Sequence, residues 1–114
     1  MEAAFARAFN ARDLTAMTAM LAPEATTELV GSGFPAEQGA GAIREGSFAH
    51  LLEGEGLRAA RLTFEGSDFV AFHAEDGTLD SLTSLTVDGD AITKLRYHTR
   101  WHDEAYVARV ADAV

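Results

Sequence analysis

The sequence predicts an α+β fold in which a curved antiparallel sheet wraps around N-terminal helices. Helical patterns occupy most of residues 1–52, with one strand among them, and strand patterns fill most of residues 57–101. Two Asp-Gly pairs separate the later strands, as the turns of β-hairpins do. Helices and antiparallel strands that are segregated along the chain are typical of α+β proteins, whose helices pack on one face of the sheet.

Length and composition fit a single domain that covers residues 1–114. Eighteen acidic residues against nine basic ones give a net charge of −9, which disfavours binding to the phosphates of nucleic acid. Cysteine is absent, and no apolar stretch is long enough to span a bilayer. We therefore expect no nucleic-acid or membrane partner, no signal peptide and a cytoplasmic location.

Two helices are expected before Pro23, which should end the second of them. Phe5 and Phe9 are four residues apart and therefore lie on one face of the first helix. Asp13 is placed to cap the second helix, because its carboxylate can accept from the first backbone amides. The buried stripe of the second helix should consist of Met17, Met20 and Leu21.

A first strand is expected over residues 25–30, where β-branched residues are frequent. The glycines that follow have neither the spacing nor the Lys-Ser/Thr pair of a phosphate-binding loop. A third helix should cover residues 42–53, and Gly46 is a weak point within it.

Four strands and a last helix are expected in the second half of the chain. The strands should cover residues 57–65, 69–75, 79–87 and 92–101. Asp103 is placed to cap the last helix. The apolar face of that helix should consist of Val107, Val110, Ala111 and Val114.

Three segments of the first half carry a family resemblance. They are Phe9-Asn10-Ala11-Arg12-Asp13-Leu14, the stretch Leu21-Ala22-Pro23-Glu24-Ala25-Thr26, and Gly41-Ala42-Ile43-Arg44-Glu45. Together with the order of elements, they resemble the nuclear-transport-factor-2-like (NTF2-like) superfamily, which includes SnoaL-like and ketosteroid-isomerase-like proteins. The resemblance implies a cystatin-like α+β cone around a cavity, and a homodimer. It implies no single activity, because the superfamily contains isomerases, cyclases, hydrolases, dehydratases and binding proteins.

The residues of the ketosteroid-isomerase site are not present in this chain. By the resemblance, its tyrosine donor falls at Phe5, its aspartate base at Leu29 and its second acidic donor near Thr83. Neither apolar side chain can exchange a proton, and threonine is not acidic. We therefore expect no steroid isomerisation.

The hairpin at residues 76–77 allows two strand registers, which place His73 differently. In a two-residue turn His73 lies opposite Asp80, and a His–Asp pair becomes possible. In a three-residue loop with Gly77 in the left-handed region, His73 lies opposite Leu79 instead. The second register matches the resemblance better.

In the second register, the concave face of the sheet is mostly apolar with a few hydroxyl groups, as expected for a small-molecule pocket. It contains Phe69, Ala71, His73, Leu79, Ser81, Thr83, Leu85, Leu95, Tyr97, Thr99 and Trp101. The predicted ligand-binding residues are Phe5, Phe9, Met17, Leu29, Phe69, Ser81, Thr83, Leu95, Tyr97, Thr99 and Trp101.

The opposite face of the sheet then combines charged and apolar side chains, which favours a homodimer interface there. Its charged or titratable residues would be Asp80, Lys94, Arg96, His98 and Arg100, and its apolar residues Val70, Phe72 and Leu82. A solvated face with weak cross-strand ion pairs is the alternative interpretation.

Three functions fit these observations. The first is binding of a small, mostly apolar molecule in the cone, without a cofactor. The second is a SnoaL-like isomerase, cyclase or lyase with His73 as the proton-transfer group and Tyr97, Thr83 or Ser81 at a carbonyl oxygen. The third is a protein-interaction module that uses the outer sheet face.

We expect no metal site in this chain. His98 and His102 are four positions apart, which corresponds to about 13 Å along a strand and is too far for one ion. A zinc site would need three converging protein ligands or more.

Overall fold

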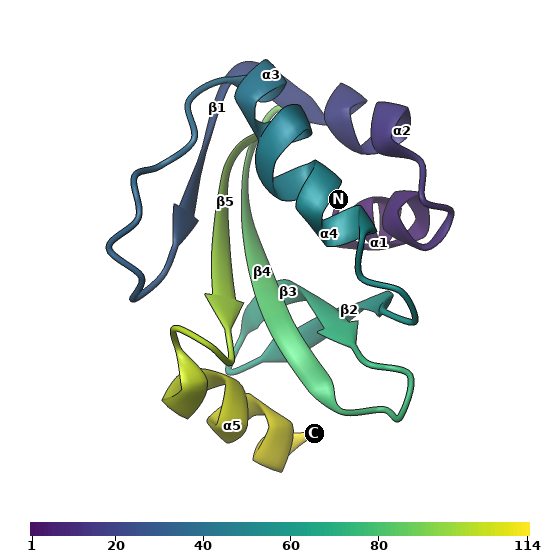
Figure 1. Ribbon diagram of the computed structural model, residues 1–114, viewed down its shortest axis with the longest axis vertical. Coiled ribbons are helices and arrows are strands. Elements are labelled where there is room, and N and C mark those ends of the chain that lie inside the picture. Colours follow the sequence, from purple (N-terminus) through teal and green to yellow (C-terminus); the bar gives the residue numbers. More distant parts are fainter.

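The computed structural model describes residues 1–114 and confirms the predicted α+β class (Figure 1). The helical elements are α1 (Glu2–Asn10), α2 (Leu14–Ala19), α3 (Ala40–Ile43), the π-helical turn η1 (Arg44–Phe48), α4 (Ala49–Leu52) and α5 (Glu104–Ala113). The strands are β1 (Leu21–Leu29), β2 (Arg58–Phe64), β3 (Ser67–His73), β4 (Leu79–Asp88) and β5 (Ala91–Thr99). No helix has the length and apolar character needed to cross a membrane.

The five strands form one sheet in the order β1-β5-β4-β3-β2. Strands β2 to β5 make the expected antiparallel meander. Strand β1 pairs with β5 in parallel, so the sheet is mixed rather than wholly antiparallel. This pairing arises because the turn before β5 returns the chain to the start of β1, where the Ile92 amide donates to the Met20 carbonyl at 2.8 Å.

The second helix is shorter and the first strand longer than the sequence predicts. Helix α2 ends at Ala19, and β1 begins at Leu21, so Pro23 lies inside the strand rather than at a helix end. Proline is tolerated there because β1 is an edge strand whose pairing with β5 is irregular between Leu21 and Thr26. Met20 is consequently half-buried and not part of a buried helical stripe.

The main core lies between the concave face of the sheet and the helices from α1 to α4. Phe9 of α1 makes an edge-to-face contact with Phe72 of β3, with ring centroids 4.9 Å apart. Phe5 packs in the same way on Phe48 of η1, at 5.5 Å. These four rings are fully buried, and such pairs stabilise a core by about 1 kcal/mol beyond area burial.

The last helix, α5, covers part of the opposite face of the sheet. A second apolar cluster joins it to β3 and β4, and consists of Phe69, Ala71, Leu79, Leu82, Val107 and Val110. Asp103 precedes α5 as predicted, but its side chain does not cap the helix. Its Oδ2 instead lies 2.8 Å from Nδ1 of His98, which is buried beneath α5.

A β-bulge in the β3–β4 hairpin reverses the predicted faces of β3. The three-residue loop is confirmed, because Gly77 has φ +88° and His73 pairs with Leu79. The next pair, however, is Phe72 with Ser81, which leaves Asp80 as an extra residue. Because of this shift of one position, Phe72 and Val70 lie on the same side of the sheet as Ser81 and Thr83, and the alternate residues of β3 lie on the other side.

The faces predicted for β3 were therefore wrong. Phe69, Ala71 and Leu79 lie in the cluster beneath α5, on the outer side of the sheet. Val70 and Phe72, predicted for the outer side, belong to the main core on the concave side. Only Leu82, of the three apolar residues expected on the outer face, is found there.

Candidate functional site

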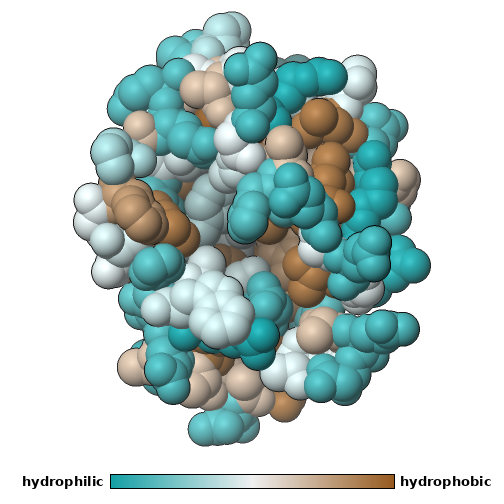
Figure 2. Space-filling view, viewed as in Figure 1, coloured by the Kyte–Doolittle hydropathy of each residue, from teal (hydrophilic) through white to brown (hydrophobic).

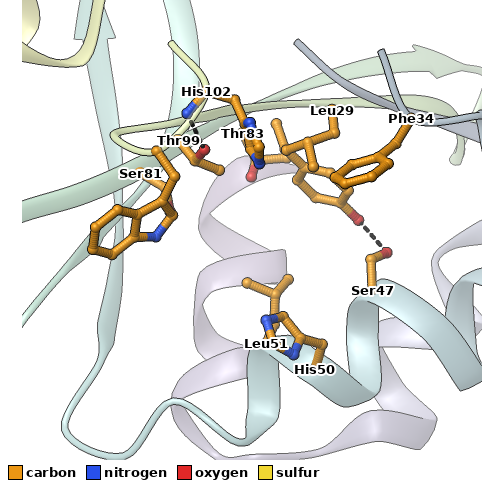
Figure 3. A pocket seen from close by; sticks show the side chains of 11 residues that line it. Leu29, Phe34, Ser47, His50, Leu51, Ser81, Thr83, Thr99 and His102 are labelled. Carbon is orange, nitrogen blue, oxygen red and sulfur yellow. Dashed lines mark hydrogen bonds between the residues drawn. The ribbon is translucent and has the colours of Figure 1, made fainter. Parts of the chain in front are cut away.

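A cavity of about 340 Å³ opens where the helices leave the concave face of the sheet uncovered. The surface is hollowed at the centre of the face seen in Figure 2, with hydrophobic side chains around the hollow. The residues that line the cavity are Leu29, Phe34, Ser47, His50, Leu51, Ser81, Thr83, Tyr97, Thr99, Trp101 and His102. They come from the sheet, from the η1–α4 segment and from two loops, and most are labelled in Figure 3.

The strand side of this cavity was largely anticipated from the sequence. The predicted residues that the structure brings together are Leu29, Ser81, Thr83, Tyr97, Thr99 and Trp101. Ser81 pairs with Thr99, and Thr83 pairs with Tyr97, so alternate residues of β4 and β5 face the same space. Whether these residues bind a ligand is part of the proposal below.

The remaining predicted ligand-binding residues do not reach the cavity. Phe5, Phe9, Met17 and Leu95 have no exposed surface and fill the core deeper in the cone. Phe69 lies on the outer side of the sheet beneath α5, because the bulge reverses β3. These side chains fill the deeper part of the cone, and the cavity lies at its open end.

His73 is also absent from the cavity. It lies at the end of β3, half-buried, and pairs with Arg58 on one side and Leu79 on the other. Its neighbour two positions earlier, Ala71, belongs to the cluster beneath α5, which places this side of β3 on the outer face. The location of His73 gives no support to a role in proton transfer within the cavity.

Five lining residues were not predicted, and each comes from outside the strands. They are Phe34, Ser47, His50, Leu51 and His102. Phe34, in the glycine-rich loop, is 65% exposed and makes an edge-to-face contact with the His102 ring at 5.8 Å. A large aromatic residue among glycines and polar residues was the one signal in the sequence that could have identified this rim.

A chain of hydrogen bonds lies behind the helical wall of the cavity. The hydroxyl oxygens of Ser47 and Tyr97 are 2.7 Å apart, and a dashed line at Ser47 in Figure 3 marks this hydrogen bond. The Ser47 amide donates to Oε2 of Glu37 at 2.8 Å, and Oε1 of Glu37 accepts from the Thr27 hydroxyl at 3.0 Å. The chain links η1 to β5 and to β1 through the loop that contains Glu37.

Tyr97 remains a neutral phenol at physiological pH. Burial raises the pKa of its hydroxyl, the hydrogen bond with Ser47 lowers this pKa, and the negative charge of Glu37 raises it further. The wall therefore presents hydroxyl groups rather than a phenolate to anything that enters the cavity.

The mouth of the cavity is aromatic and contains two histidines. Besides Tyr97, His50 and His102 are the only titratable residues that line the cavity, because no Lys, Arg, Asp or Glu is among its lining residues. Trp101, 71% exposed, has the Arg100 guanidinium 4.4 Å from the centre of its ring. Its side chain also borders a second hollow of about 360 Å³, which continues toward Glu53 and Asp80.

No three His, Cys, Asp or Glu side chains come together in the way that a metal site requires. His102 lines the cavity, whereas His98 lies beneath α5 with Asp103. The two histidines considered from the sequence as ligands thus belong to different parts of the molecule.

No family model and no curated protein matches this sequence. Solved structures do resemble it. An NTF-2 like protein of unknown function from Burkholderia xenovorans LB400 has a TM-score of 0.66 at 12% identity, over 84% of this chain and 77% of that one. A candidate polyketide cyclase from Sinorhizobium meliloti has a TM-score of 0.60 at 22% identity, over 82% and 88%.

A third similar structure contains a small molecule. This protein from Catenulispora acidiphila DSM 44928, of ketosteroid isomerase-like fold and in complex with trimethylamine, has a TM-score of 0.55 at 18% identity, over 82% of this chain and 80% of that one. These comparisons confirm the predicted resemblance at the level of the fold: the chain has the NTF2-like fold.

Proposed function

We propose that this protein binds a small, mostly apolar molecule in the cavity at the open end of its cone. The observation that supports the proposal is the cavity itself, because its volume of about 340 Å³ falls within the range of small-molecule pockets. Its walls combine apolar side chains such as Leu29 and Leu51 with the hydroxyl groups of Ser47, Ser81, Thr83, Tyr97 and Thr99. This is the composition typical of a ligand site.

The exposure of two large aromatic residues at the mouth supports the same function. Phe34 and Trp101 are 65% and 71% exposed although they line the cavity. A ligand that fills the cavity would contact both rings and bury part of this exposed surface. Burying their exposed apolar surface would contribute to affinity at roughly 25 cal/mol per Å². A protein of similar fold, from Catenulispora acidiphila, forms a complex with a small molecule, trimethylamine.

A second candidate function is a SnoaL-like enzyme that acts on a small carbonyl compound. It is favoured by the two imidazoles of His50 and His102, because histidine exchanges protons near neutral pH. It has no support from the ketosteroid-isomerase positions, which by the resemblance fall at Phe5, at Leu29 and near Thr83. Ligand binding without chemistry therefore needs fewer assumptions.

Homodimer formation through the outer sheet face also remains a proposal. Helix α5 occupies part of that face, and the uncovered part carries an ion-pair cluster in which Glu28 contacts Arg96 at 3.1 Å and Lys94 at 3.6 Å. The mass of the protein in solution, measured by light scattering during size-exclusion chromatography, tests it directly: a mass of 12.2 kDa at all concentrations would contradict it.

The only tryptophan of the chain, Trp101, lines the cavity and provides a built-in probe for the binding test. We expect 2-acetylnaphthalene to change its fluorescence in a saturable way. Thr99→Phe, which fills the cavity, should abolish this change, whereas Thr86→Phe, at an exposed position of β4, should leave it in place. Equal binding by both variants, or no binding by the wild type, would contradict the proposed function.

A further inference from the structure

We propose that Glu37, Ser47 and Tyr97 act as one unit that makes the cavity select a neutral oxygen acceptor, such as a ketone carbonyl, over a carboxylate. The inference rests on the proposed function and specifies the chemical class of its ligand. Glu37 does not line the cavity itself, and it acts through the two hydroxyl-bearing residues that do.

The first step of the argument is the number of hydroxyl protons. Ser47 and Tyr97 carry one hydroxyl proton each, and the hydrogen bond between their oxygens, at 2.7 Å, uses one of them. Whichever residue donates in this bond, the other proton is left over. Both residues line the cavity, so the remaining proton can be donated to an acceptor atom of the ligand.

The second step is the fixed position of Glu37. Its two carboxylate oxygens accept from the Ser47 amide at 2.8 Å and from the Thr27 hydroxyl at 3.0 Å. The Glu37 amide in turn donates to the Thr27 hydroxyl at 3.2 Å. Gly46 makes room for the carboxylate, because a Cβ at this position would overlap Glu37 Oε2. The negative charge is therefore held directly behind the hydroxyl pair.

The third step is electrostatic. No Lys or Arg lines the cavity, so no fixed cation there balances the charge of Glu37. The pKa of Tyr97 is raised by burial and, in addition, by the charge of Glu37, which means that an anion at this wall is disfavoured. A ligand carboxylate at the same place would be disfavoured for the same two reasons, whereas a carbonyl would only accept the available proton.

Three probes of nearly equal shape test the selection. 2-Acetylnaphthalene presents a neutral carbonyl, 2-naphthoate a carboxylate, and 2-isopropenylnaphthalene no acceptor. By isothermal titration calorimetry at neutral pH, we expect the ketone to bind about threefold to tenfold more tightly than the alkene, the value of one net hydrogen bond. We expect the carboxylate to bind at least tenfold more weakly than the ketone.

Variants assign these differences to the three residues. The double variant Ser47→Ala/Tyr97→Phe removes both hydroxyl protons, so it should lower the affinity for the ketone to that for the alkene and leave the alkene unchanged. Glu37→Gln should raise the affinity for 2-naphthoate about tenfold. Glu45→Gln, at an exposed position of the same π-helical turn, makes the same change of net charge and should have no comparable effect. The melting temperature of each variant shows whether it is folded.

The outcomes separate this inference from the proposed function. If the carboxylate binds as tightly as the ketone, or if Glu37→Gln and Glu45→Gln shift it equally, the selection by Glu37 is overturned while the cavity remains a binding site. If Ser47→Ala/Tyr97→Phe weakens ketone and alkene alike, or weakens neither, the hydroxyl pair is not the donor. If none of the three probes binds to the wild type, the proposed function fails and this inference fails with it.

Discussion

Gly46 lies directly against the carboxylate of Glu37, so that a Cβ at position 46 would overlap Glu37 Oε2. A glycine inside a helix normally costs about 1 kcal/mol relative to alanine. Here the missing side chain lets the carboxylate reach the Ser47 amide within the π-helical turn. A residue that weakens the helix as an isolated element therefore allows the contact that joins this helix to the loop before it.

We predict that Gly46→Ala destabilises the protein, by about 1–3 kcal/mol, because the new methyl group must displace the Glu37 carboxylate or the helix. Gly41→Ala is the matched control, because Gly41 is also helical and a Cβ there meets nothing within 4 Å. The control should be neutral or stabilising by up to about 1 kcal/mol. Urea unfolding measures both values, and equal stabilisation by the two substitutions would argue against the Gly46–Glu37 contact.

Leu82→Ala should destabilise the protein by about 2–5 kcal/mol and leave ligand binding intact. Leu82 is fully buried between the sheet and α5, on the side away from the cavity. Its neighbour Thr83 faces the cavity, because successive side chains of a strand point to opposite faces. Urea unfolding and the fluorescence titration together check the prediction. A loss of less than 1 kcal/mol would mean that α5 does not pack on Leu82 as described.

His73→Ala should leave the affinity for 2-acetylnaphthalene within about twofold of the wild type, because His73 lies on the outer face and not in the cavity. His102→Ala is the informative comparison, since it removes a ring that lines the mouth and contacts Phe34. Its affinity should be lower. A strong effect of His73→Ala in a variant of normal stability would return His73 to the candidate site.

The sequence was sufficient to predict the fold because each level of its pattern agrees with the others. Helical periodicity before residue 52, strand patterns after residue 57 and the Asp-Gly turns all indicate a helical layer on a meander. The left-handed Gly77 and the pairing of His73 with Leu79 belong to one of the two registers that turn chemistry allows, the one favoured by the family resemblance. Whether two distant strands pair in parallel or antiparallel has no comparable signal in the local sequence, and the parallel pairing of β1 with β5 was therefore not predicted.

The candidate site could be predicted along the strands and at Trp101, in the turn that follows β5. Alternation along β4 and β5 identifies Ser81, Thr83, Tyr97 and Thr99 correctly as residues of one face. A single extra residue, Asp80, changes the result for β3, because a bulge has no reliable signature in one sequence and reverses every side chain beyond it. The η1–α4 wall depends on how a helix sits on the sheet, which no local pattern specifies.

The buried phenol of Tyr97 should make stability depend on pH in the alkaline range. In the unfolded chain a tyrosine ionises with a pKa of about 10, whereas burial raises the pKa of Tyr97 in the folded protein. The unfolded state therefore releases this proton first. The contribution of Tyr97 is fully present below pH 10, and the free energy of unfolding should fall as pH rises further, by up to about 1.4 kcal/mol per pH unit for one group.

Urea unfolding of the wild type and of Tyr97→Phe, at pH values on either side of about 10, measures this dependence. The variant should lose stability less steeply with rising pH, because it has no phenol to ionise at this position. Tyr106→Phe removes the only other tyrosine hydroxyl and should retain the part of the slope due to Tyr97. If Tyr97→Phe and the wild type had the same slope above pH 10, the phenol would ionise equally in both states. The wall of the cavity would then be open to anions, contrary to the selection proposed for Glu37, Ser47 and Tyr97.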